Sequence, residues 1–272
     1  MHDTSADRPP VVSTAVALFT IRDDALQVLL APAGDGSLAL PGAPPRHDEG
    51  LVAAARRVLA EAAGAEDVWL EQLYTFGDPA RNPARREVAV TWYALVSADR
   101  ARAVDSADAA APRADAARWC PVAALPPLAL DHRRIVDYAV QRLRNKLEYT
   151  TVGFQLLPAR FTLGELQRVY EAILGRPLDK RNFRRKVELL GIVRPTREMR
   201  RAGAQRPAQL WRFAATEAPE AIGGPPANTH ASSPPVELLR VARLSPSLRR
   251  GPSRGAVTPP ETPATPERGS AA

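Results

Sequence analysis

The chain has 272 residues, with 37 lysine and arginine residues against 30 acidic ones and a formal net charge of +7. This length accommodates one large or two small domains, and a hydrophobic fraction of 45% is sufficient for folded cores. The basic balance favours a polyanionic partner. The single cysteine, Cys120, excludes an internal disulfide. Only Arg8 precedes a short apolar run at the N-terminus, which predicts neither a secretory signal nor a membrane span, so we expect a cytoplasmic protein.

The first half of the chain predicts strands on either side of one helix. Residues 1–10 end in two prolines and are expected to form a disordered tail. The β-rich runs VVSTAVALFTI and LQVLLA are separated by RDDA, which predicts an antiparallel hairpin. A short strand (LAL), a helix over LVAAARRVLAEAA that stops at Gly64, and the strands VWLEQLYTF and EVAVTWYALV follow. Trp92 and Tyr93 alternate along the last strand, so one of them should be in the core. We predict an α+β domain over residues 11–130.

The next segment, DHRRIVDYAVQRLRNKLE, predicts a helix that joins two domains over residues 131–149. Its apolar face is formed by Ile135, Tyr138, Ala139, Leu143 and Leu147. Residues 150–213 are rich in helix signals and form a second predicted domain. Eleven of the 27 prolines lie beyond residue 214, among serine, threonine, alanine and glycine, so residues 214–272 are expected to be a disordered tail.

Residues 161–191 predict two helices joined by a tight turn. Thr162 and Glu165 have the spacing of a capping box, and an apolar stripe follows and ends before Gly175. Asp179 can cap a second helix that ends at Gly191. The inward face of this second helix is expected to comprise Phe183, Val187 and Leu190. A basic second helix after a tight turn suits insertion into the major groove of DNA.

The segment after the second helix predicts a wing, with a strand at IVRP, a basic loop around residues 202–203 and a returning strand QLWRF. Residues 176–213 contain twelve basic and three acidic residues, and this excess of nine exceeds the charge of the whole chain. A merely solvated basic face is the alternative, but the coincidence of caps, turn and wing favours a DNA-binding surface. The expected DNA contacts are Lys180, Arg181, Asn182, Arg184, Arg185, Arg200, Arg201 and Arg206.

The first helix and its preceding loop, PGAPPRHDEGLVAAARRVLAEAAG, resemble the Nudix box G-x5-E-x7-R-E-U-x-E-E-x-G-U, in which U is aliphatic. The matching residues are Glu49, Arg57, Leu59, Glu61 and Gly64. Ala43, Val58 and Ala62 stand where the family has its first glycine and two glutamates. In the family, carboxylates on one face of this helix hold magnesium against a diphosphate, and only Glu61 of three remains here. A chance match of an alanine-rich helix is the alternative, but the flanking strands favour the resemblance.

Residues 11–213 as a whole resemble the NrtR-type, Nudix-related transcriptional regulators. The segments GFQLLPARFTLGELQRVYEAILGRPLDKRNFRRKVELLGI and RPAQLWRF carry this resemblance in the second domain. It implies a Nudix-like α/β/α sandwich with a mixed sheet, followed by a winged helix-turn-helix domain. It also implies a homodimeric repressor, often of genes for NAD synthesis or salvage. The resemblance implies further that the Nudix domain senses a nucleotide such as ADP-ribose, which weakens binding to a double-stranded DNA operator.

The loss of two carboxylates is compatible with a sensor, which binds its ligand without consuming it. We therefore expect no catalytic residue, no metal site and no cofactor. The expected effector contacts are Glu49, Arg57 and Glu61 of the box, Phe76 for stacking a base, and Arg81, Arg85 or Arg86 for a diphosphate. An ordinary salt bridge between Arg57 and Glu49 is equally well supported.

Two other functions stay open on the sequence alone. One is an active, magnesium-dependent Nudix hydrolase of ADP-ribose or a related nucleoside diphosphate. The other is a constitutive DNA-binding protein whose Nudix domain serves only dimerisation.

Overall fold

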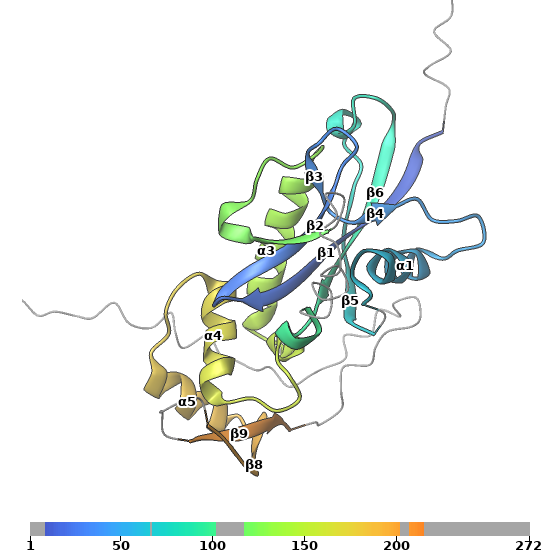
Figure 1. Ribbon diagram of the computed structural model, residues 1–272. Helices are drawn as coiled ribbons and strands as arrows, with labels where there is room; N and C mark the ends of the chain where they lie inside the picture. Colours follow the sequence, from blue (N-terminus) through green and yellow to red (C-terminus); the bar gives the residue numbers. More distant parts are fainter. Residues whose placement is uncertain (1–8, 66, 102–116, 202–206, 215–272) are drawn as a thin grey trace, which may run out of the picture.

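The structure is a computed structural model that describes residues 9–65, 67–101, 117–201 and 207–214 (Figure 1). Except for Pro9, Pro10 and Ala214, both predicted tails lie outside the described residues.

A mixed sheet forms the centre of the first domain. Strand β1 pairs antiparallel with β2 through the predicted hairpin and parallel with β6, and the order is β3-β2-β1-β6-β5. In the hairpin turn, Asp23 and Asp24 have φ values of 51° and 56°, the left-handed conformation that two-residue hairpin turns adopt. The strands are β1 (Val11–Arg22), β2 (Ala25–Pro32), β3 (Leu38–Ala39), β4 (Gly42–Ala43), β5 (Trp69–Phe76), β6 (Glu87–Leu95) and β7 (Arg118–Pro121).

Helices cover both faces of this sheet, α1 (Leu51–Ala63) on one and α3 (His132–Leu147) on the other (Figure 1). Side chains that alternate along β1 divide between the two cores: Val16 and Leu18 pack with α1, whereas Ala17 and Phe19 pack with α3. The predicted α/β/α sandwich with a mixed sheet is therefore confirmed.

Two expectations about single side chains differ from the structure. Trp92 and Tyr93 are both buried, because one packs in the core beneath α1 and the other in the core beneath α3. Tyr138, expected on the apolar face of its helix, is 45% exposed and contacts Tyr74 at the edge of the sheet, with ring centroids 5.5 Å apart. The buried face of α3 is formed by His132, Ile135, Val136, Ala139, Val140, Leu143 and Leu147.

The second domain has the predicted winged helix-turn-helix arrangement. Helix α4 begins with a complete capping box: Glu165 N–H donates to the Thr162 hydroxyl at 3.1 Å, and Thr162 N–H donates to the Glu165 carboxylate at 2.7 Å. Asp179 accepts a hydrogen bond from Asn182 N–H at 2.8 Å and so caps α5. The predicted inward residues Phe183 and Val187 are buried, whereas Leu190 is exposed because α5 has already ended. The elements are η3 (Val152–Leu156), α4 (Leu163–Leu174), α5 (Lys180–Leu189), β8 (Val193–Arg200) and β9 (Ala208–Phe213).

Helix α3 contacts both domains. Its apolar face continues from the sheet into the core that contains α4 and η3. At its C-terminal end, Arg144 Nε donates to the carbonyl oxygen of Ile173 in α4 at 2.8 Å. The tip of the β1–β2 hairpin also reaches α4, where Arg168 lies 3.6 Å from Asp24. A displacement of the sheet relative to the winged helix must therefore change contacts of α3, α4 or this tip.

Candidate nucleic-acid interface and effector site

The outward face of α5 carries exposed cations. Phe183 and Val187 turn inward, and with about 100° of rotation per residue Arg181 and Arg185 project on the opposite side. Among the described residues, no acidic side chain forms an ion pair with the basic side chains of this face. The exposed polar residues in the first two turns of α5 are Lys180, Arg181, Asn182, Arg184 and Arg185.

The charge of α5 is not compensated locally. The pKa of Lys186 is lowered, first by partial burial of its amine and then by repulsion from Arg185. Neighbouring cations that raise one another's free energy are stabilised when a polyanion supplies the missing counter-charge. This face can therefore bind phosphates through Lys and Arg side chains and can present Asn182 and the arginines to base edges.

The other three expected DNA contacts belong to the predicted wing, and the structure describes two of them. Arg200 donates to the Glu165 carboxylate at 2.6 Å and to the carbonyl oxygen of Arg160 at 3.1 Å, so its guanidinium is held against the start of α4. This pairing links the wing to α4, while the Arg200 side chain stays 39% exposed, and its contact with DNA remains a prediction. Arg201 is exposed, and Arg206 lies outside the described residues.

The Nudix-box loop is held by a bidentate ion pair. Arg57 Nε and Nη2 each lie 2.9 Å from an oxygen of Glu49, and Nη2 also donates to the carbonyl oxygen of Pro44 at 3.1 Å. The hydrogen bond from Arg57, followed by that from Arg46 N–H, lowers the pKa of Glu49 to about 2. The structure therefore contains the salt bridge between Arg57 and Glu49, which was the alternative interpretation of Arg57. Both Glu49 oxygens and the guanidinium already have partners within the protein.

The side chains of the box do not fit the magnesium that its resemblance implies. Val58 is 3% exposed and packs in the core, and Ala62 packs against that core without an oxygen ligand. Glu61 lies 3.4 Å from Arg57 and 3.7 Å from Arg46. In the part of the chain that the structure describes, no three acidic, histidine or cysteine side chains are grouped as a metal site. A hard dication prefers several oxygen ligands, whereas the two carboxylates at matching box positions, Glu49 and Glu61, both lie beside guanidinium groups.

Sequence reasoning missed Arg46 as a member of this site. It lies in the box loop, three residues before Glu49, and its side chain is 66% exposed. Its position in the sequence gave no sign of a contact with Glu61, which lies fifteen residues further on. The fold creates this contact when the loop turns back over α1.

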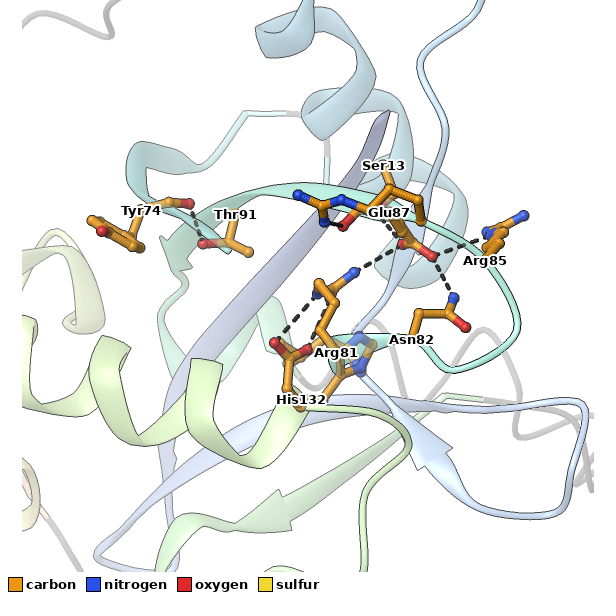
Figure 2. Close-up of polar contacts among 11 residues, drawn as sticks. Ser13, Tyr74, Arg81, Asn82, Arg85, Glu87, Thr91 and His132 are labelled. Atoms are coloured by element: carbon orange, nitrogen blue, oxygen red, sulfur yellow. Dashed lines mark hydrogen bonds and ion pairs between the residues drawn. The ribbon is translucent and has the colours of Figure 1, made fainter. Parts of the chain in front are cut away.

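A buried polar cluster joins the β5–β6 loop to the start of α3 (Figure 2). The Arg81 side chain is 1% exposed and lies between two carboxylates, with Nη1 3.0 Å from Glu87 and Nη2 2.8 Å from Asp131. Glu87 also accepts hydrogen bonds from Ser13 and Asn82, both at 2.6 Å, and from Arg85 at 3.2 Å.

Next to this cluster, His132 accepts a hydrogen bond from Leu40 N–H at 2.9 Å through Nδ1. Burial lowers the pKa of His132, so the ring stays neutral and keeps this acceptor. Together these contacts fix the N-terminal end of α3 against the sheet.

This cluster corrects two expected effector contacts. Arg81 was expected to face a diphosphate, but it is buried and its guanidinium is occupied by Glu87 and Asp131. Phe76 was expected to stack a base, but its ring is 6% exposed beneath Tyr74 and Tyr138. Arg85 and Arg86, from the same loop as Arg81, remain exposed.

The stability of the first domain should depend on the ionisation of Glu87. Burial opposes its charge, but the hydrogen bonds from Ser13, Asn82 and Arg85 outweigh burial and lower its pKa from 4.5 to about 2. A carboxylate with a depressed pKa stabilises the fold above its ordinary pKa, and this contribution is lost as the pH falls from about 4.5 to about 2. We expect urea unfolding at pH 6, 4 and 3 to show this loss, and Glu87→Gln to lose less stability over the same range. An equal acid dependence of both proteins would contradict this role.

The structure also bears on membrane insertion. None of the helices in the described ranges combines the length and the apolar character needed to cross a bilayer.

Two family models match the chain. Residues 12–139 match the NUDIX domain, and residues 153–213 match the NrtR DNA-binding winged helix domain. A relative from Acinetobacter baylyi, described as an ADPR responsive transcriptional repressor NtrR, is 34% identical over 213 residues, which cover 75% of this chain and 82% of the relative.

Solved structures agree with these matches. NrtR of Shewanella oneidensis in complex with a 27mer DNA is 32% identical, with a TM-score of 0.66 over 74% of this chain and 93% of that chain. The same protein without DNA is 34% identical, with a TM-score of 0.65 over 75% and 94%. A MutT/nudix family protein from Enterococcus faecalis shares the fold at 21% identity, with a TM-score of 0.57 over 76% of this chain and 87% of that chain.

Proposed function

Because the chain belongs to the NrtR family of regulators that join a Nudix domain to a winged helix, we propose that it is a transcriptional repressor. It binds double-stranded operator DNA through α5 and the wing, and it releases the DNA when its Nudix domain binds ADP-ribose. The observation that carries the proposal is the row of unpaired cations on the outward face of α5, above a core of Phe183 and Val187. Genes of NAD metabolism are the proposed targets, on the strength of the family alone.

The described interface between the domains supports coupling of the two sites. Helix α3 is anchored at its start by the Arg81–Asp131 ion pair and at its end by the bond from Arg144 to α4. Between the domains lies a cavity of about 790 Å³, which Asp24, Arg144 and Arg168 help to line. An effector shifts the balance between two arrangements of the domains if it binds one arrangement more tightly.

We propose further that the Nudix domain binds ADP-ribose without hydrolysing it. What supports this is the replacement of two box glutamates by Val58 and Ala62, together with the bidentate capture of Glu49 by Arg57. A homodimer belongs to the same proposal, since a two-fold symmetric pair of α5 helices would meet two operator half-sites.

One experiment tests the proposal as a whole. The full chain is used to select DNA from a randomised duplex library, and the selected operator is then bound in the presence and absence of ADP-ribose. We expect sequence-specific binding that ADP-ribose weakens, and no AMP when ADP-ribose and magnesium are incubated with the protein. Failure to enrich any sequence would contradict the repressor, and turnover to AMP that Glu61→Gln abolishes would support a hydrolase instead.

A further inference from the structure

The Nudix box lacks two carboxylates of its family pattern, and the loop before its helix carries an arginine, Arg46. In a box built for a dication, the metal bridges protein carboxylates and the phosphates of the ligand. Here Val58 and Ala62 supply no oxygen ligand, and both oxygens of Glu49 are bonded to Arg57. Glu61 has two guanidinium groups within 3.7 Å. The positive charge beside Glu61 thus comes from arginine side chains.

Of the two arginines beside Glu61, Arg46 and Arg57, only Arg46 has a guanidinium group that is available to bind a ligand. Its backbone is fixed, because Arg46 N–H donates to Glu49 at 3.0 Å and Glu49 N–H donates to the Arg46 carbonyl oxygen at 3.2 Å. Its side chain is 66% exposed, and the 3.7 Å separation from Glu61 exceeds hydrogen-bond distance. Arg57, by contrast, is 16% exposed and is committed to Glu49 and Pro44. The five N–H donors of Arg46 therefore remain available for a ligand, on a residue whose backbone is held in place.

We propose that this site binds the phosphate groups of its nucleotide effector without a divalent cation, through the guanidinium of Arg46. The inference rests on the proposed function and specifies how the Nudix domain recognises its ligand. A guanidinium matches two phosphate oxygens at once and forms charge-assisted hydrogen bonds with them. Glu61 then competes with the phosphate for Arg46 and also repels the phosphate. It thus opposes phosphate binding, whereas a metal-binding glutamate would promote it.

The test is calorimetric titration of the full chain with ADP-ribose, once in EDTA and once with magnesium. We expect saturable binding of similar affinity in both buffers. Arg46→Ala should weaken binding by about tenfold or more, since a charge-assisted contact is lost. Arg46→Lys should retain part of the affinity, because it keeps the charge but not the paired donors. Glu61→Gln should bind ADP-ribose more tightly than the parent protein.

Arg118→Ala is the matched control, because it removes an exposed arginine from β7 rather than from the box loop. Its affinity for ADP-ribose should equal that of the parent chain, and the melting temperature of each variant shows that it is folded. Binding that requires magnesium, or that Glu61→Gln abolishes, would overturn the inference and leave the proposed repressor intact. So would an unchanged affinity in Arg46→Ala. Absence of binding in both buffers would overturn ADP-ribose as the effector and the inference with it.

Discussion

Replacing both Arg181 and Arg185 by alanine is expected to weaken operator binding by about 100-fold or more, since each arginine contact to DNA contributes roughly 1–3 kcal/mol. Both side chains project from α5 opposite the buried Phe183 and Val187, so the helix should keep its packing without them. With each phosphate contact that is lost, binding of the protein releases fewer counterions from the DNA. The slope of log K against log salt should therefore become shallower by about 0.9 for each such contact. Fluorescence anisotropy with a labelled operator, over a series of salt concentrations, measures both effects.

A double substitution of Arg118 and Arg133 by alanine controls for the loss of two positive charges. Both residues are exposed, and they lie in β7 and near the start of α3, not in the winged helix. This control should bind the operator nearly as tightly as the parent chain. If the two double variants lost affinity equally, general charge rather than α5 would account for binding.

Arg81→Ala is expected to lower the free energy of unfolding by about 3–5 kcal/mol, because it removes the buried cation that lies between Glu87 and the partly buried Asp131. The substitution removes the only side chain in the described residues that bridges Glu87 of β6 and Asp131 at the start of α3. In a protein of this size, such a loss lowers the melting temperature by roughly 2–4 °C per kcal/mol. Urea unfolding followed by circular dichroism gives the free energy directly.

Arg85→Ala provides the matched control, because Arg85 also pairs with Glu87 but its side chain is 56% exposed. An exposed pair contributes at most about 1 kcal/mol, so this variant should remain close to the parent chain. Similar losses in the two variants would mean that the buried cluster does not anchor α3 as its geometry indicates.

Local features of the fold could be predicted from the sequence, because each depends on residues close in the chain. Thr162 and Glu165 cap α4 across three residues, and Gly64 and Asp179 mark helix ends through their own backbone or side chain. A layered fold also followed, since a helix that lies between strands packs on a face of their sheet. The alternation of Trp92 and Tyr93 was misleading only because it predicts one buried face, whereas this sheet has two.

The site residues were harder to predict, because their partners are distant in sequence. Arg81 looks like a surface arginine in the loop GDPARNPARR until Asp131, fifty residues later, is placed beside it. Arg200 is similarly one of many wing cations, and its pairing with Glu165 follows from how β8 packs on α4. Charge counts locate a basic surface, but they cannot say which guanidinium groups the fold has already neutralised.

If one chain links ADP-ribose binding in the Nudix domain to DNA binding at α5, the effects of the two ligands on each other's affinity must be reciprocal. ADP-ribose would be titrated calorimetrically into the free chain and into the chain saturated with its operator. We expect the operator to weaken ADP-ribose binding by the same factor by which ADP-ribose weakens operator binding. An ADP-ribose affinity that saturating operator leaves unchanged would contradict it.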